Sequence, residues 1–482
     1  MVTLILFAAL GPARGLIWAV VVGYLFLPEN FGFDIPGLPP YDKKTAISFS
    51  LLLPAMLYWG KVDPVRANAP MVRVFILSCI AVMILGSVGT YLQNTNTLIN
   101  AHIVRSGLSA RDVISMASDT VLITLPMLLA WHFLRRPEDH RDLLVAVVIM
   151  GLVYTLLALF ELRMSPRLAK WVYGYFPHDW RQHLRGGGYR PVAFLEHGLS
   201  LGFFLFSAAV AGLALGRDKS KPNGVLYLFA GLWCFLILSI SRNLGATLLA
   251  VIFIPAVLIL GFRAQVRVGA VLAAMLLSYP VLSTVTLGPA TRGLELLESV
   301  APERAQSFQF RLDNEHMLMD RAMEKPAFGW GGFSRQRVFD ERGRDQTVTD
   351  GLWIITLGQG GWVKYLAFFG ILCGPLLFLR RAARRKKISA PIAGMALIMG
   401  GNFVYMIPNS TLSPVAFIML GAMAAFIQFD TAKEDTPAPV EPGSDRPRSR
   451  YSRFAHSHTA PGADEMPSRR LTRPALGQGG RT

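Results

Sequence analysis

Apolar runs long enough to form membrane-spanning helices recur along nearly the whole chain. A helix needs about 20 mostly apolar residues to cross the hydrocarbon core of a bilayer. Apolar side chains make up 52% of the 482 residues and charged ones 16%, whereas soluble domains carry about 25% charged residues. The chain therefore lacks the polar residues that several soluble domains would need to cover their surfaces. The sequence predicts an all-α, polytopic integral membrane protein.

The runs predict about twelve transmembrane helices. They lie at residues 2–27, 45–60, 72–93, 112–134, 142–162, 191–215, 224–240, 243–262, 266–287, 352–379, 390–408 and 412–429. Gly11 and Pro12 interrupt the first run. We expect residues 1–429 to form one membrane domain, with a large loop, 288–351, between the ninth and tenth spans. Residues 430–482 are rich in proline and arginine, which predicts a disordered tail.

The distribution of Lys and Arg predicts the orientation of these spans. The net charge is +17, and in membrane proteins an excess of Lys and Arg marks the cytoplasmic loops. Cation-rich short joints alternate with cation-poor ones along the chain. The cation-rich joints are residues 61–71, 135–141, 216–223, 263–267 and 380–389. Both termini and the tail are therefore expected in the cytoplasm, and the loop 288–351 on the outer side. This bias accounts for the basic net charge of the chain. We therefore expect the lipid bilayer as a partner and no binding of nucleic acid.

The cysteines and short motifs give no sign of a cofactor. Cys79, Cys234 and Cys373 all lie in apolar runs, without CxxC or His–Cys spacing. They are typical of small core residues and predict neither a disulfide framework nor a metal site. A Walker loop is absent from the sequence, which argues against an ATP-driven pump.

Two outer loops carry more positive charge than the orientation rule predicts. Residues 163–190 contain six cations and residues 288–351 contain nine. Long loops cross the membrane regardless of charge, so the predicted orientation stands. The cations either form a solvated surface or serve an anionic substrate.

Arg242 stands in the short joint between the seventh and eighth spans. Ionisable residues at the edge of a span are costly and are functional candidates for that reason. Arg242 is either an anchor whose side chain reaches the interface or a guanidinium that binds phosphate through two hydrogen bonds. The tight joint favours a fixed position.

A second cluster precedes the sixth span. Three glycines, 186–188, would let the backbone approach a ligand closely. Arg190 follows at the mouth of the span, and Glu196 and His197 are expected one to two helical turns deeper. These two side chains could act as a general base and its partner. They could equally form a buried pair that fixes helix packing.

The largest outer loop holds a third cluster. Residues 303–324 have the composition of an amphipathic helix that carries Arg311, Glu315 and His316. Either this helix lies at the membrane interface without chemistry or its polar residues belong to a site. Asp350, at the mouth of the tenth span, is another possible acid or base.

In the order of these motifs the chain resembles the O-antigen ligase and polymerase family of bacterial envelope glycosyltransferases. The resemblance covers residues 70–429. It rests on Arg190-Pro191, on Ser239-x-Ser241-Arg242, on Arg311 followed by Glu324-Lys325-Pro326-x-Phe328-Gly329-x-Gly331, and on the span that contains Gly358 and Gly361.

The resemblance implies a metal-independent enzyme of the bacterial inner membrane that needs no cofactor and works at the periplasmic face. Its donor would be a glycan linked to undecaprenyl diphosphate, and its acceptor a hydroxyl of a glycan, lipid or protein. Arg190, Arg242 and Arg311 would contact the diphosphate.

The reaction also needs a general base that activates the acceptor hydroxyl. Ligases of the family usually have a histidine shortly before the glycine-containing span. This chain has residues 345–350 there, and His316 lies farther upstream, which favours a polysaccharide polymerase over a ligase. Asp350 would then be the base, with Glu196 and His197 as alternatives. A flippase or transporter of lipid-linked saccharide is the rival class, and it would have broken helices in two corresponding halves. A membrane scaffold would leave Arg190 and Arg242 without a purpose.

Overall fold

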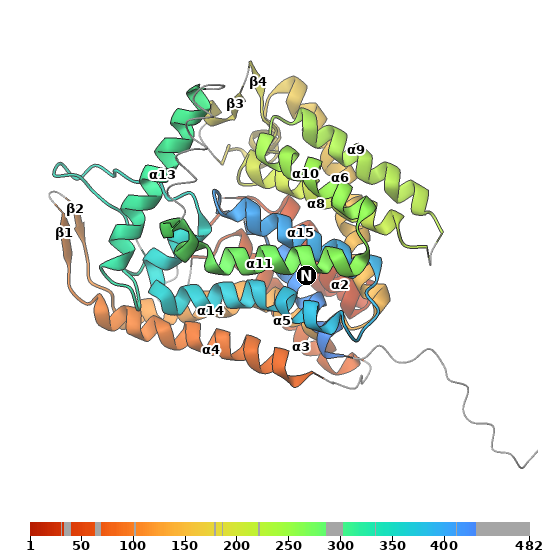
Figure 1. Ribbon diagram of the computed structural model, residues 1–482, viewed down its shortest axis with the longest axis horizontal. Helices are drawn as coiled ribbons and strands as arrows, with labels where there is room; N and C mark the ends of the chain where they lie inside the picture. Colours follow the sequence, from red (N-terminus) through yellow and green to blue (C-terminus); the bar gives the residue numbers. More distant parts are fainter. Residues whose placement is uncertain are drawn as a thin grey trace, which may run out of the picture. The chain divides into compact units, whose positions relative to one another are not determined.

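α-Helices account for nearly all the regular structure in the part of the chain that the computed structural model describes (Figure 1). That part comprises residues 1–29, 31–32, 40–62, 69–100, 103–177, 180–185, 187–219, 222–285, 302–332, 334–410 and 412–429. The predicted tail, 430–482, and the first part of the predicted loop 288–351 lie outside the described residues. The expected all-α class is confirmed for the rest.

The helices follow the predicted runs closely, and four very short strands form two hairpins. The helices are α1 (Val2–Leu10), α2 (Pro12–Phe26), α3 (Lys43–Tyr58), α4 (Pro70–Gln93), α5 (Ala110–Phe133), α6 (Pro137–Met164), α7 (Leu168–Tyr173), α8 (Gly198–Gly216), α9 (Gly224–Ile240), α10 (Leu244–Ile259), α11 (Phe262–Val285), α13 (Pro302–Met323), α14 (Leu352–Ala382), α15 (Ala390–Met406) and α16 (Pro414–Gln428). Short 3₁₀ turns lie at Trp59–Lys61 and Trp180–His183. The antiparallel hairpins pair β1 (Leu98–Asn100) with β2 (Ile103–Arg105), and β3 (Leu184–Arg185) with β4 (Gly188–Tyr189).

Six of the described helices are long and apolar enough to cross a membrane: α4, α5, α6, α8, α11 and α14. Shorter apolar helices (α2, α9, α10, α15 and α16) lie among them. A helix of 15 residues rises about 22 Å, less than the roughly 30 Å thickness of the hydrocarbon core. The structure therefore supports a membrane-embedded chain built on six long apolar helices.

The first predicted span, 2–27, is not one helix. The chain breaks at Gly11, whose φ is +79°, and α1 packs back against α2. A Cβ at Gly15 would lie 2.7 Å from the Cα of Phe7, so the two helices touch through their backbones. The prediction of a single span was wrong because apolar composition alone does not reveal where a helix turns.

The described joints gather at two ends of the helix bundle. At one end, Arg190 Nε donates to the carbonyl of Arg242, and Leu352 N donates to the carbonyl of Asn409. We call this the α13 end, because α13 and both hairpins also lie there (Figure 1). At the opposite end, Lys386 Nζ donates to the carbonyls of Phe426 and Phe429 at 3.0 and 2.9 Å. These contacts place the joints of Arg190, Arg242 and Asn409 at one end and that of Lys386 at the other; the full predicted topology stays a prediction.

Helix α14 is interrupted near its first third. Gly361 has φ +61° and ψ −166°, a combination that is essentially restricted to glycine. A Cβ there would lie 2.4 Å from the backbone carbonyl of Ala327, so another segment of the chain fills the break.

That segment is residues 326–331, which we call the inserted loop. Its backbone pairs with α14 on both sides of the break: Trp330 N donates to the carbonyl of Gly358 at 2.9 Å, and Trp362 N donates to the carbonyl of Pro326 at 2.8 Å. Gly329, with φ +66°, would bring a Cβ to 2.6 Å from the backbone of Gly360. The two glycine-containing motifs of the sequence therefore fit each other, and they do so as loop against broken helix rather than helix against helix.

Candidate functional site

Arg190 and Arg242 lie next to each other at the α13 end. Arg242 occupies the joint between α9 and α10 with φ +57°, which a non-glycine residue adopts only when its surroundings hold it. A Cβ at Gly188 would lie 2.4 Å from Nη2 of Arg242, so the β3–β4 hairpin rests directly on this guanidinium. The stem of Arg190 packs in the same way on Gly198, the first residue of α8. The glycine run thus lets the backbone approach an arginine closely.

A buried carboxylate holds the segment that carries Arg190. Glu161, at the end of α6, is 0% exposed and accepts backbone N–H groups from Val192 and Ala193, each at 2.7 Å, and from Leu168 at 3.1 Å. These bonds satisfy donors that would otherwise be buried without partners, a cost of about 1–3 kcal/mol each. Glu161 therefore supplies the acceptor for two backbone N–H groups, of Val192 and Ala193, in a segment that forms no helix.

This segment corrects the predicted positions of Glu196 and His197. The helix predicted for 191–215 begins only at Gly198, so both residues precede α8 instead of lying inside it. His197 caps the helix, because its Nδ1 accepts from Leu199 N at 3.0 Å. Its ring lies 4.9 Å from that of His183.

Glu196 is an exposed residue close to a buried ion pair. In that pair, Lys43 Nζ binds Glu29 Oε1 at 2.7 Å and also donates to the carbonyl of Phe194 at 3.1 Å. Neither Glu196 nor His197 lines the cavity described next.

A cavity of about 670 Å³ opens between α13 and the ends of α11, α14 and α15. It falls within the size range of ligand sites in proteins. The charged and titratable residues among its lining are Tyr279, Arg311, Glu315, His316, Asp320 and Asp350. The cavity therefore brings together Arg311 and Asp350, which the sequence places 39 positions apart.

His316 also lines this cavity. The sequence places His316 well before the stretch 345–350 where ligases of the resembled family have a histidine. In the structure, His316 and Asp350 line the same cavity, because α13 packs against the start of α14. His316 is therefore close to the stretch 345–350 in space although it is far from it in the sequence.

The two carboxyl groups of the cavity have shifted acidities. Burial raises the pKa of Glu315 to about 7, the negative charge of Asp350 adds to this, and Tyr279 and Arg311 oppose it. Burial also raises the pKa of Asp350, against the opposing charge of Arg311. Arg311 Nε lies 3.9 Å from Asp350 Oδ2, and both side chains are nearly half exposed, so their attraction is weak. Glu315 is consequently a carboxyl group that can take up and release a proton near neutral pH.

Hydrogen bonds fix α13 over this cavity. Asn314 is buried on the inner face of α13, and its Oδ1 accepts from Val348 N at 2.8 Å. Leu352 N, at the start of α14, donates to the carbonyl of Asn409 at 3.3 Å. Asp350 lies between these two anchors, so the cavity wall that it forms is held at both ends.

Several cations of the large loop bind other groups of the chain, whether they are buried or exposed. Arg335 is 3% exposed and donates to the carbonyls of Trp330, Ser106 and Asn96. Lys325 donates to the carbonyl of Gln93. Three more bind acidic or aromatic side chains; these contacts are Arg321 with Glu324 and Trp330, Arg337 with Asp345, and Arg344 with Asp340. Arg311 differs from these five because it lines the cavity.

Tyr405, near the end of α15, connects the two groups of arginines. Val404 and Ile407, which flank Tyr405 on α15 and just beyond it, line the cavity that holds Arg311. The Tyr405 hydroxyl donates to Asn243 Oδ1, beside Arg242, at 3.3 Å, and Asn243 Nδ2 donates to the carbonyl of Gly198, on which Arg190 packs, at 3.0 Å. Arg190, Arg242 and the α13 cavity therefore surround one region at the α13 end.

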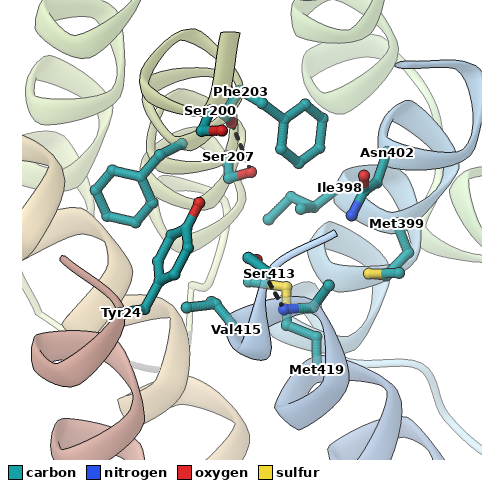
Figure 2. Close-up of a pocket in the computed structure, with 12 residues that line it drawn as sticks. Tyr24, Ser200, Phe203, Ser207, Ile398, Met399, Asn402, Ser413, Val415 and Met419 are labelled. Atoms are coloured by element: carbon teal, nitrogen blue, oxygen red, sulfur yellow. Dashed lines mark hydrogen bonds between the residues drawn. The ribbon is translucent and has the colours of Figure 1, made fainter. Parts of the chain in front are cut away.

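A further pocket lies deeper, between α2, α8, α15 and α16. Figure 2 shows Tyr24, Ser200 and Asn402 around it. Its volume is about 20 Å³, which is enough for one water molecule and too small for a substrate. Within the described residues, Oδ1 of the buried Asn402 has no hydrogen-bond partner, which suits a bridging water.

No protein-family model matches this chain, and no curated protein matches it. Among the described residues, no group of three or more His, Cys, Asp or Glu side chains has the arrangement of a metal site.

Sequence reasoning placed Glu315 on the α13 helix without assigning it a role. The spacing of four residues between Arg311 and Glu315 puts them on one helix face, and this was the available signal. Glu161 was missed although it is an ionisable residue inside an apolar run.

Proposed function

We propose that the chain is a membrane glycosyltransferase of the O-antigen ligase and polymerase type. It takes a glycan from undecaprenyl diphosphate at the periplasmic face of a bacterial inner membrane and extends a surface polysaccharide. The observation that carries this proposal is the placement of Arg190 and Arg242 side by side, around the same region as the cavity of Arg311, Glu315 and Asp350.

The arginines suit a lipid diphosphate leaving group. When the glycosidic bond to the diphosphate breaks, negative charge develops on the leaving oxygen. Guanidinium groups bind phosphate through paired hydrogen bonds and stay charged at every physiological pH. Arg190 and Arg242 can therefore stabilise this charge without a metal ion, with Arg311 approaching from the cavity.

The carboxyl groups suit the acceptor side of the reaction. The acceptor hydroxyl must lose its proton as it attacks the anomeric carbon, and a base with a pKa near the working pH is effective. Glu315 has that property, so we assign it the role first given to Asp350; burial keeps its pKa raised, and the negative charge of Asp350 makes a smaller contribution. His197 caps the start of α8 instead, and Glu196 lies near the ion pair of Lys43 and Glu29.

The pH dependence of transfer tests this assignment. Below pH 7 the Glu315 carboxyl is protonated and cannot accept a proton; above pH 7 it is ionised. We expect the transfer rate to rise roughly tenfold between pH 6 and pH 8 and then to level off. The measurement is transfer by the purified enzyme in detergent across this range. Glu315→Gln should be slow and should lose the rise, whereas an unchanged profile in that variant would remove Glu315 from the mechanism.

Deletion of the gene, followed by analysis of lipid-linked intermediates and envelope glycans, tests the function itself. For a polymerase we expect long chains to disappear and single repeat units to accumulate on undecaprenyl diphosphate at the periplasmic face. Long chains stranded on the carrier would instead indicate a ligase.

A flippase of lipid-linked saccharide is the alternative function. It would use the same arginines and would break no bond, so its loss should trap intermediates on the cytoplasmic face. The break in α14 is a feature of such transporters, but they have corresponding breaks in two halves. Among the described helices, α14 alone contains a residue with non-helical backbone angles.

A further inference from the structure

A second cavity lies across α14 from the first. It has a volume of about 260 Å³ and is lined by residues of α4, α5 and α14 and by Gly332, which follows the inserted loop. The polar side chains that the argument uses are Ser87, Thr90, Asp119, Thr120, Gln359 and Lys364. We call it the α4–α5 cavity.

The cavity reaches well into the membrane-embedded bundle. Asp119 is the tenth residue of α5 and Lys364 the thirteenth of α14, both counted from the α13 end. At about 1.5 Å per residue these side chains start roughly 15–20 Å below that end. Charged groups at such a depth are costly in a membrane protein and face water-filled spaces or functional sites.

Asp119 and Lys364 face each other without touching. Asp119 is exposed and Lys364 half-buried, and both line the cavity. Their opposite charges attract across the space, but no ion pair within 4.0 Å joins these two described residues. The carboxylate and the ammonium group therefore leave room for a molecule that can donate to one and accept from the other.

The rest of the lining favours the same kind of molecule. Ser87, Thr90 and Thr120 line the cavity, but their hydroxyls already donate to backbone carbonyls and keep only acceptor capacity. Gln359 offers an amide, which can both donate and accept. Hydroxyl groups of a saccharide can serve all of these partners, whereas an apolar acyl chain would leave them unsatisfied.

The two cavities share the first part of α14 as a wall. Gly351, Trp353 and Ile354 line the α13 cavity, and Gln359 lines the α4–α5 cavity a few residues farther on. The break at Gly361 and the inserted loop hold this wall in place. A glycan bound in the α4–α5 cavity would thus be separated from the diphosphate-binding arginines by one helix.

We propose that the α4–α5 cavity binds a saccharide segment of the acceptor glycan, between the Asp119 carboxylate and the Lys364 ammonium group. This inference rests on the proposed function, because it presupposes a glycan acceptor. It adds an acceptor subsite to the enzyme and assigns its two charged residues.

Thiol labelling of a cavity residue tests the proposal. Ser115→Cys places a thiol in the cavity wall, and the chain without this substitution gives the background from its own cysteines. We expect a membrane-impermeant methanethiosulfonate reagent to label Ser115→Cys in the purified protein. The probe is the free oligosaccharide released by mild acid from the cells' lipid-linked intermediates. It should slow labelling at least severalfold, and Asp119→Asn or Lys364→Gln should abolish this protection. Glu341→Gln, an exposed loop variant, should retain it.

A thiol that resists the reagent, or one that is labelled equally fast with and without oligosaccharide, would overturn the proposal. If the proposed function fails, the wild-type chain itself should not bind the lipid diphosphate donor. Crosslinking of the wild-type chain to a photoreactive undecaprenyl diphosphate reports donor binding independently, and Asp119→Asn and Lys364→Gln should leave it unchanged. Loss of that crosslinking in both variants would mean that the two residues act on the donor site or on the fold and not on the acceptor.

Discussion

Replacing Arg242 with alanine should lower glycan transfer by about 10²–10³-fold, the effect of removing one pre-positioned donor to a developing charge. Arg242 is held in place, because its strained backbone and Gly188, which rests on its guanidinium, leave the side chain few alternatives. Arg190→Ala should have an effect of the same order. The measurement is the amount of long-chain glycan in cells that carry each variant, normalised to the protein in the membrane fraction.

The controls separate charge from geometry. Arg242→Lys keeps the positive charge but loses the paired hydrogen bonds, so it should recover only part of the activity. Arg344→Ala removes an exposed cation that binds Asp340 and should leave transfer unchanged. Normal glycan output from both Arg242→Ala and Arg190→Ala would refute their role as diphosphate ligands. Loss of output with Arg344→Ala would show that the total charge of the loop matters rather than these two positions.

The sequence predicted Arg190 and Arg242 as functional candidates but did not predict that they touch. Each was recognised from its place at the mouth of a span, because charge at a membrane edge is rarely without purpose. Their adjacency was not predicted. It depends on the β3–β4 hairpin folding over the joint between α9 and α10, and nothing local in either segment encodes that contact.

Some helix boundaries could be predicted from the sequence and others could not. The predicted span 224–240 coincides with α9, because the apolar run there is helical along its whole length. The span predicted from 191 begins seven residues later, because an apolar and buried segment can also be irregular if another residue satisfies its backbone. Here that residue is Glu161, which lies some 30 positions upstream.

The carboxyl group that we propose as the base was the hardest to identify. Glu315 and Asp350 are both acidic residues in the large loop, and the sequence does not indicate which one has the pKa nearer neutrality. That depends on α13 packing over the start of α14, where Glu315 meets Tyr279 of α11. The intramembrane residues Asp119 and Lys364, by contrast, could have been marked in advance by the rule that identified Arg242.

Gly361→Ala should be among the most destabilising single changes in the protein. The φ and ψ angles of Gly361 are essentially open to glycine only, and an added Cβ would meet the backbone of Ala327 at 2.4 Å. The backbone strain alone costs about 1–3 kcal/mol. The clash adds to it, because the inserted loop is tied to α14 by hydrogen bonds on both sides of the break and cannot move away freely. We therefore expect a loss of about 3 kcal/mol or more, measured as a lower unfolding temperature in detergent.

The same change should also impair transfer, since the first part of α14 carries the wall shared by both cavities. Gly329→Ala should behave similarly, because it introduces a Cβ at 2.6 Å from the same stretch of α14 at a positive φ. Gly332→Ala is the matched control: it lies just beyond the inserted loop, an added Cβ meets nothing within 4 Å, and its unfolding temperature should equal that of the wild type. If Gly361→Ala unfolded at the wild-type temperature, the pairing of the inserted loop with the broken helix would have to be abandoned. The assignment of one shared wall to the two cavities would then lose its support.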